Sequence, residues 1–208
     1  MDSIPKTNEF VIWTLVGPMG PEAPLDLLKH SVLAVDGGAM YTSKIDTWTG
    51  DSDSYTGKPP GLINHTLPRE KARSDLGHAL DLITHFSRLE LHLWGFLGGR
   101  RDHEMINFGE IIHFSKSKDH LLAVFYGSNG KIQAKICSRG NWTFEHQGLF
   151  SIISFEDQSI QMSGNCKYML EKPTQIKAFS SQTLSNEAFG LFNVSSDKSF
   201  MILFNDEK

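Results

Sequence analysis

Two aspartates in a short polar segment are the first candidates for chemistry in this chain. The segment Gly50–Ser54 reads GDSDS, so Asp51 and Asp53 lie two residues apart. In an extended or turning backbone, this spacing points both carboxylates the same way. Mg²⁺ commonly binds one or two carboxylates together with the phosphate oxygens of a substrate. The alternative is a solvated acidic turn, since Asp and Ser are common turn residues.

A second candidate is a glycine-rich segment that carries two arginines. Residues 98–103 read GGRRDH and lie between an apolar run and a helical pattern. Backbone N–H groups at the start of a helix bind anions, and the planar guanidinium groups of Arg100 and Arg101 suit phosphate. Asp102 could be an N-cap, a metal ligand or a base. The spacing matches neither a Walker A loop nor the dinucleotide fingerprint. The segment therefore predicts a phosphate site from the chemistry of its residues alone.

Two further acids lie at points where a ligand could approach the backbone. Asp36 is followed by Gly37 and Gly38, directly after the apolar run 31–35. Glycines at the carboxyl end of a strand let a ligand come close, although a tight turn explains them equally well. Asp75 begins a helical pattern, where it either complements the helix dipole or provides a third metal ligand.

The elements that must position these residues follow an alternating order in the first 127 residues. Apolar runs rich in β-branched and aromatic residues predict buried strands, and apolar residues at helical spacing predict two helices between them. The strands are expected at 10–16, 31–35, 89–96 and 121–126, and the helices at 74–87 and 102–115. This alternation is typical of a doubly wound parallel sheet. Residues 1–127 are therefore expected to form an α/β domain with a Rossmann-like parallel sheet.

The pattern changes after Gly127. Short apolar segments separated by turn residues predict strands at 131–137, 141–145, 151–155, 175–179, 189–195 and 199–204. No long amphipathic helix is visible in this part. Residues 128–208 are therefore expected to form a second, all-β sandwich domain.

Composition narrows the classes of partner. The 208 residues contain 20 Lys and Arg against 24 Asp and Glu, for a formal net charge of −4. A nucleic-acid partner is not expected, because such proteins usually carry a basic excess. The chain has no apolar stretch of about 18 residues and no signal peptide, which predicts no membrane association and a cytoplasmic location. Cys137 and Cys166 are expected to be idle thiols in a reducing compartment.

Taken in order, the motifs form a set that resembles the thiamine pyrophosphokinase family. They are DGGA at 36–39, GDSDS at 50–54, SDLGHALDL at 74–82, GGRRDHEMIN at 98–107, KY at 167–168 and LSNEA at 184–188. Each is weak alone, but their order along nearly the whole chain makes the resemblance specific.

The resemblance implies a Mg²⁺-dependent enzyme that transfers pyrophosphate from ATP to thiamine, giving thiamine diphosphate and AMP. It also implies that residues 1–127 form a catalytic, nucleotide-binding α/β domain and residues 128–208 a thiamine-binding β-sandwich. A homodimer with its sites at the subunit interface is implied as well.

The resemblance also assigns roles to individual residues. Asp51, Asp53 and Asp75 would hold the metal and, with Asp102, form the catalytic set. Either Asp75 or Asp102 could take the proton from the thiamine hydroxyl. The ATP-binding residues would be Asp36, Gly37, Gly38, Arg100, Arg101 and Asn107. The thiamine-binding residues would be Ser74, Tyr168, Ser185 and Asn186.

The chain departs from the family pattern before its first predicted helix. Where the family commonly has an acid-rich stretch, this sequence has Ala72 and Arg73. Two alternatives to the thiamine enzyme are therefore kept. One is a related pyrophosphokinase that acts on another alcohol, such as a hydroxymethylpterin. The other is a non-catalytic module that binds thiamine or a nucleotide.

Overall fold

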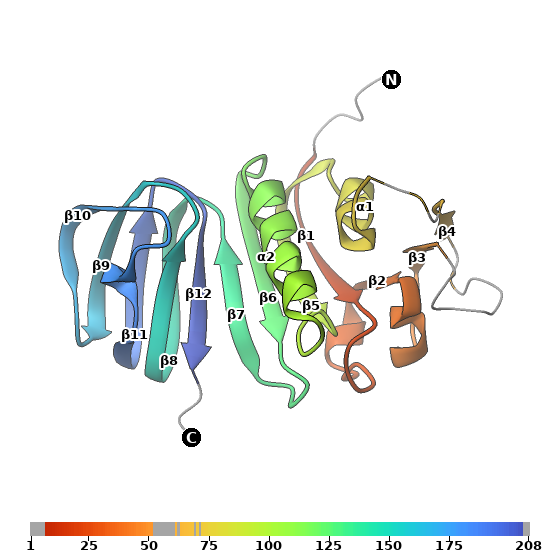
Figure 1. Ribbon diagram of the computed structural model, residues 1–208, viewed down its shortest axis with the longest axis horizontal. Coiled ribbons are helices and arrows are strands. Elements are labelled where there is room, and N and C mark those ends of the chain that lie inside the picture. The colour runs from red at the N-terminus through yellow and green to blue at the C-terminus, as the bar shows by residue number, and fades with distance from the viewer. Residues whose placement is uncertain (1–6, 52–60, 62, 69, 71, 206–208) are drawn as a thin grey trace.

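Runs of β-branched and aromatic residues form the parallel strands at the centre of the sheet. These are β1 (Thr7–Val16), β2 (Ser31–Val35), β5 (Phe86–Trp94) and β6 (His120–Tyr126). Leu15, Leu33, Leu91 and Phe125 in these strands are fully buried. The four strands expected in the first part of the sequence are confirmed, with ends shifted by up to three residues. Figure 1 shows the chain as a computed structural model, which describes residues 7–51, 61, 63–68, 70 and 72–205.

The remaining strands complete the sheet on both sides of this centre. They are β3 (Thr47–Gly50), β4 (Ile63–Thr66), β7 (Ile132–Cys137), β8 (Gly140–Ser154), β9 (Gln158–Cys166), β10 (Leu170–Ile176), β11 (Asn186–Ser196) and β12 (Phe200–Asn205). Strands β3, β4 and β9 are not among the predicted ones, and β10 overlaps the strand expected at 175–179 only at Gln175 and Ile176. The two strands expected at 141–145 and 151–155 are halves of the single strand β8.

Two α-helices pack on one face of the parallel strands (Figure 1). Helix α2 (Arg101–Ser115) confirms the prediction to within one residue. Helix α1 (Asp75–Leu82) begins at the N-cap Ser74, whose side chain accepts a hydrogen bond from the Gly77 N–H, but it is shorter than expected. Phe86 and Ser87 belong to β5 instead, because Phe86 pairs with Thr7 and the Ser87 hydroxyl donates to the Thr7 carbonyl.

Three short 3-10 helices complete the list of elements, namely η1 (Leu27–Lys29), η2 (Asp36–Tyr41) and η3 (Ser181–Thr183). No helix within the described ranges has the length and apolar character needed to cross a membrane.

The prediction of a Rossmann-like domain followed by a separate β-sandwich is wrong. The structure has a single mixed sheet of 12 strands, in the order β10-β9-β11-β8-β12-β7-β6-β5-β1-β2-β3-β4. The six strands from β6 to β4 are parallel to one another, and every pairing from β6 through β7 to β10 is antiparallel. The change in sequence texture after residue 127 therefore marks a change in strand direction within one sheet.

A tight turn is the physical reason for this continuity. The Gly127 N–H donates to the Lys131 carbonyl at 2.9 Å, and Gly130 has a φ of +79°. The turn folds β7 back onto β6, so the backbone ladder runs on without a gap. Ala134 and Ile136 of β7 share one buried cluster with Leu91 and Phe125 of the parallel strands. The division of the chain into domains 1–127 and 128–208 remains a prediction.

A second buried cluster lies in the antiparallel part of the sheet. Phe150, Phe192 and Phe200 are fully buried in it, and the Phe150 and Phe192 rings stack at 4.5 Å. Cys137 and Cys166 lie in the same cluster as buried free thiols, and burial raises the pKa of both. Both thiols are thus free and buried, and their expected lack of a chemical role remains a prediction.

Strand β10 forms one edge of the sheet. Its register against β9 is interrupted between Leu170 and Thr174, and Pro173 lies within this interruption. Proline has no N–H to donate, so it is tolerated at an edge strand and not within a central one.

Candidate active site

A cavity of about 440 Å³ lies where the parallel strands meet the two helices. Its walls come from the residues that follow β1, β2 and β5 and from the first turns of α1 and α2. From β1 the chain continues to β2 on one side, whereas from β5 it continues through α2 to β6 on the other. Ligands of open α/β sheets bind outside the carboxyl ends of the strands at such a switch point.

Glycines allow the strand ends around this cavity to approach one another. A Cβ atom on Gly38 would lie 1.9 Å from the Val16 carbonyl oxygen, and one on Gly17 would lie 2.6 Å from the Gly95 oxygen. No side chain fits at such distances. Gly38 therefore holds η2 against the end of β1, and Gly17 and Gly95 hold the ends of β1 and β5 together. These contacts form the base of the cavity.

Asp36 presents a buried carboxylate at the edge of the cavity. Its side chain is predominantly buried, and its backbone has a φ of +49°, which is unusual for a residue with a side chain. The Trp48 indole N–H donates to the Asp36 carbonyl at 3.0 Å and holds this conformation. The Asp36 Oδ1 atom has no hydrogen-bond partner among the described residues. A buried acceptor in this state is costly, and a cation or a ligand donor would satisfy it.

Asp75 and Ser74 place the start of α1 on the same cavity. The Ser74 hydroxyl accepts from Gly77 and lies 3.2 Å from a Glu110 oxygen, so its bonds are used to join α1 to α2. Arg73 makes two bonds to Asp81, at 2.7 and 2.8 Å, and one to Glu110 at 3.2 Å. The hydrogen bond to Asp81 raises the pKa of Arg73. The positive charge before α1 is therefore neutralised by α1 and α2.

Arg100 and Asp102 form a two-point ion pair at the start of α2. The Arg100 Nε lies 3.1 Å from one Asp102 oxygen, and an Arg100 terminal nitrogen lies 2.5 Å from the other. Both residues are exposed, and the bond from Arg100 lowers the pKa of Asp102 to about 2. Asp102 therefore remains a carboxylate at neutral pH and is a weak base.

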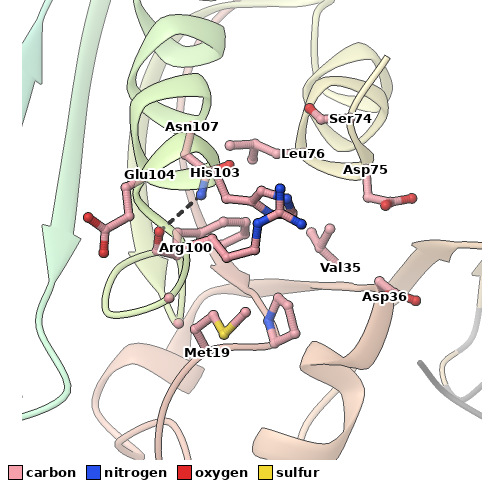
Figure 2. Close-up of a pocket in the computed structure, with 14 residues that line it drawn as sticks. Met19, Val35, Asp36, Ser74, Asp75, Leu76, Arg100, His103, Glu104 and Asn107 are labelled. Atoms are coloured by element: carbon pink, nitrogen blue, oxygen red, sulfur yellow. Dashed lines mark hydrogen bonds between the residues drawn. The ribbon is translucent and has the colours of Figure 1, made fainter. Parts of the chain in front are cut away.

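Figure 2 shows how the residues at the start of α2 face the cavity. Arg100 and His103 extend into the space between the helices, with Asp75 and Asp36 on the opposite side. The Glu104 carboxylate points away from Arg100 and accepts from the Gly98 N–H. Asn107 donates to the Phe96 carbonyl at 3.0 Å and fixes the strand end beside it. Arg101 is exposed and does not line this cavity.

The acidic side chains suit a hard cation. Asp36 and Asp75 line the cavity, and Asp51 directly follows β3 at the same edge of the sheet. Asp53 lies outside the described residues. Within the described part of the chain, no three His, Cys, Asp or Glu side chains form a metal site by themselves. Carboxylates at this edge, with the unsatisfied Asp36 oxygen, fit Mg²⁺ that completes its shell with phosphate oxygens and water.

The structure does not bring Tyr168, Ser185 and Asn186 to this cavity. They lie at β9 and β11, and four strands separate β11 from β5 in the sheet. At about 4.8 Å per strand, the two groups are roughly 24 Å apart along the sheet. The sequence motifs therefore fall into two groups that lie far apart in the sheet of one chain.

The Asn186 side chain fixes the backbone at Tyr168 and Glu187 through three hydrogen bonds, which we call the Asn186 bracket. The Asn186 side chain is buried; its Oδ1 accepts from Tyr168 N–H at 2.9 Å and from Glu187 N–H at 2.8 Å. Its Nδ2 donates to the Tyr168 carbonyl at 2.7 Å. The Tyr168 ring is 61% exposed, with the Lys167 Nζ 5.6 Å from its centre. Asn186 thus holds an exposed aromatic ring in place. Ser185 is exposed, has a φ of +54°, and its N–H donates to Ser151.

Nine residues that line the cavity were not among the predicted site residues, and Pro18, Met19 and Glu104 are three of them. Pro18 and Met19 follow β1, and Glu104 lies in the first turn of α2. The signal for the first two is in the sequence, because they come directly after a buried parallel strand, as Asp36 does. Glu104 carries no signal of its own, since an acid in the first turn of a helix is common.

Comparison with known proteins supports the fold. The structure matches a thiamine pyrophosphokinase from Bacillus subtilis with a TM-score of 0.72 and 23% identity, over 94% of this chain and 100% of that chain. It matches one from Geobacillus thermodenitrificans with a TM-score of 0.68 and 21% identity, over 95% and 99%. It matches one from Candida albicans with a TM-score of 0.70 and 11% identity, over 93% and 88%.

No family model and no curated sequence matches the chain. The structural matches therefore confirm the predicted resemblance to thiamine pyrophosphokinases at the level of the fold.

Replacing Gly38 tests the base of the cavity. We expect Gly38→Ala to lower the free energy of unfolding by about 3 kcal/mol or more, because the new methyl group overlaps the Val16 carbonyl. Gly109→Ala in α2 is the matched control, since a Cβ there meets open space, and we expect it to stabilise the protein by about 0.5–1 kcal/mol. Urea denaturation followed by circular dichroism measures both, and equal effects would contradict this role of Gly38.

Replacing Asn186 tests the bracket. We expect Asn186→Ala to cost about 2–3 kcal/mol of stability, because backbone groups of Tyr168 and Glu187 lose buried partners. Asn193→Ala on the same strand is the control; Asn193 accepts one exposed bond from Thr143, and we expect a change within about 0.5 kcal/mol. Denaturation midpoints compare the two variants, and a neutral Asn186→Ala would remove the bracket role.

Proposed function

We propose that this protein, which has the fold of thiamine pyrophosphokinases, transfers the pyrophosphoryl group of ATP to the hydroxyl group of thiamine. The products are thiamine diphosphate and AMP. The observation that carries the proposal is the cavity at the switch point, which combines the carboxylates of Asp36 and Asp75 with the guanidinium group of Arg100. This combination suits a nucleotide polyphosphate and its cation.

The reaction forms one P–O bond and breaks another. The thiamine hydroxyl oxygen attacks the β-phosphorus of ATP. The bond between that phosphorus and the oxygen that bridges it to the α-phosphorus breaks, so this oxygen leaves with AMP. Arg100 would bind the phosphate oxygens, and the start of α2 would offer its N–H groups. Mg²⁺, held by Asp36 and Asp51 with Asp53, would neutralise the charge of the phosphates.

Asp75 is our candidate for the base that takes the hydroxyl proton. The low pKa of Asp102 and its pairing with Arg100 make Asp102 a poor acceptor. Asp75 lines the cavity from the first turn of α1. Asp102 would instead orient Arg100, so that its guanidinium group faces the phosphates.

The departure at Ala72 and Arg73 does not argue against catalysis. Arg73 is bound to Asp81 and Glu110 and is not part of the cavity wall. The residues at positions 72 and 73 therefore do not alter the polar side chains that line the cavity. This favours an enzyme over the alternative of a non-catalytic module.

A second copy of the chain would complete the site. Tyr168 and its bracket lie next to β11, five strands along the sheet from β5, which leads to Arg100. We therefore expect that one chain alone does not bring thiamine against both. We propose a homodimer in which the exposed Tyr168 ring of one copy packs on thiamine near the cavity of the other.

Product formation tests the activity and separates the two acids. With ATP, Mg²⁺ and thiamine, we expect AMP and thiamine diphosphate in equal amounts, measured by chromatography, and neither without thiamine.

Asp75→Asn should lower kcat at least about 100-fold with ATP binding retained. Asp102→Asn should chiefly raise KM for ATP, because Arg100 loses its partner.

The reverse pattern would assign the base to Asp102. Absence of thiamine-dependent product, with ATP binding intact, would redirect the proposal to another alcohol, a hydroxymethylpterin first.

Mixing variants tests the shared site. Arg100→Gln and Tyr168→Ala would each be inactive alone. Random reassortment of the two should restore about a quarter of wild-type activity, because half of the dimers then hold one intact site out of two. The control mixes Arg100→Gln with Asp36→Asn, which alter the same half and should restore nothing. Recovery in both mixtures, or in neither, would contradict a site shared between copies.

A further inference from the structure

A second cavity lies at the other end of α2. It has a volume of about 180 Å³ and is lined by the end of α2 and by the connections β7–β8 and β11–β12. Figure 1 shows these connections at the end of the sheet where α2 finishes, opposite the loop that precedes α2. The 15 residues of α2 correspond to about 22 Å, so this cavity is distinct from the candidate active site.

The floor of this cavity is made of buried polar side chains. Ser115, Lys118 and Ser199 line it with exposed fractions of 1%, 3% and 7%. The Lys118 Nζ donates to the carbonyls of Thr84 and Phe86 at 2.6 and 2.8 Å. The hydroxyl oxygens of Ser115 and Ser199 lie 2.7 Å apart. Burying polar side chains costs free energy unless they are hydrogen-bonded. The hydrogen bonds of these three side chains therefore fix the base of the cavity.

The rim of the cavity carries an excess of positive charge. Lys116 pairs with Glu156 at 3.1 Å, and an Asp197 oxygen accepts from the Ser159 N–H at 2.8 Å. Arg139 and Lys198 also line the rim. Across the described ranges, neither of these two side chains forms an ion pair with a carboxylate. With Lys116 paired to Glu156, Asp197 is the one lining carboxylate left beside Lys118, Arg139 and Lys198, so the cavity keeps a net positive charge.

We propose that this second cavity binds a tetrahedral dianion, either free phosphate or the phosphate group of a small phosphomonoester. Its volume is several times the roughly 30 Å³ that one water occupies, so a phosphate group fits with some hydration. The guanidinium group of Arg139 can bind two phosphate oxygens side by side, and Lys198 adds a mobile point charge. The site is independent of the proposed transfer reaction.

Calorimetric titration at low ionic strength tests this site with two probes, inorganic phosphate and glycerol 3-phosphate. The test variant is Arg139→Gln/Lys198→Gln; both side chains are exposed, so the fold should persist. Arg100→Gln disables the candidate active site instead. Arg88→Gln/Lys172→Gln removes the same charge from exposed positions outside both cavities.

We expect phosphate binding to survive in Arg100→Gln and in Arg88→Gln/Lys172→Gln, and to weaken at least about tenfold in Arg139→Gln/Lys198→Gln. Tighter binding of glycerol 3-phosphate would identify an ester as the ligand, and equal binding would identify free phosphate. Loss of binding in Arg100→Gln alone would assign the phosphate to the active site and overturn the proposal. Equal weakening in the two charge-matched double variants, or no binding at millimolar phosphate, would also overturn it.

Discussion

The close approach of three strand ends is the constraint on which the site depends. Gly17, Gly38 and Gly95 allow backbone to lie against backbone where β1, β2 and β5 finish. With side chains there, the ends would separate and η2 would move away from β1. Asp36 would then lose the position that buries its carboxylate. The chemistry of the cavity thus depends on residues that have no side chain.

Much of the parallel half of the fold follows from local patterns. The buried runs of β1, β2, β5 and β6 are strong signals, because each strand is covered by apolar neighbours. The signal for α2 is weaker, because its buried residues lie only in its last turns. Weaker signals failed where tertiary contacts decide. Strand β4 is exposed along its length, and β9 alternates polar and apolar residues up to Gly164 and Asn165, so neither has a continuous apolar run. The helical spacing that continues to Phe86 is overridden by pairing with Thr7.

The motifs identified candidate residues better than they identified how those residues act. Spacing placed Asp36, Asp75 and Arg100 near strand ends and helix starts, and these three do share one cavity. The sequence could not reveal that the Asn186 amide hydrogen-bonds to the backbone of Tyr168, or that Ser74 joins α1 to α2. Such partners depend on residues that are distant in the chain. The single sheet was missed for a similar reason, because a turn at 127–131 reads the same between two domains as within one sheet.

The edge strand β10 limits how copies of this protein can associate. A sheet whose outer strand offers free N–H and C=O groups can recruit a strand from another molecule and grow into a fibre. Pro173 removes one donor from the middle of β10, the register is broken beside it, and the neighbouring Lys172 adds charge. Extension of the sheet by addition of another strand at this edge is therefore blocked. Two copies that meet at this edge must therefore do so through side chains and not through a shared backbone ladder.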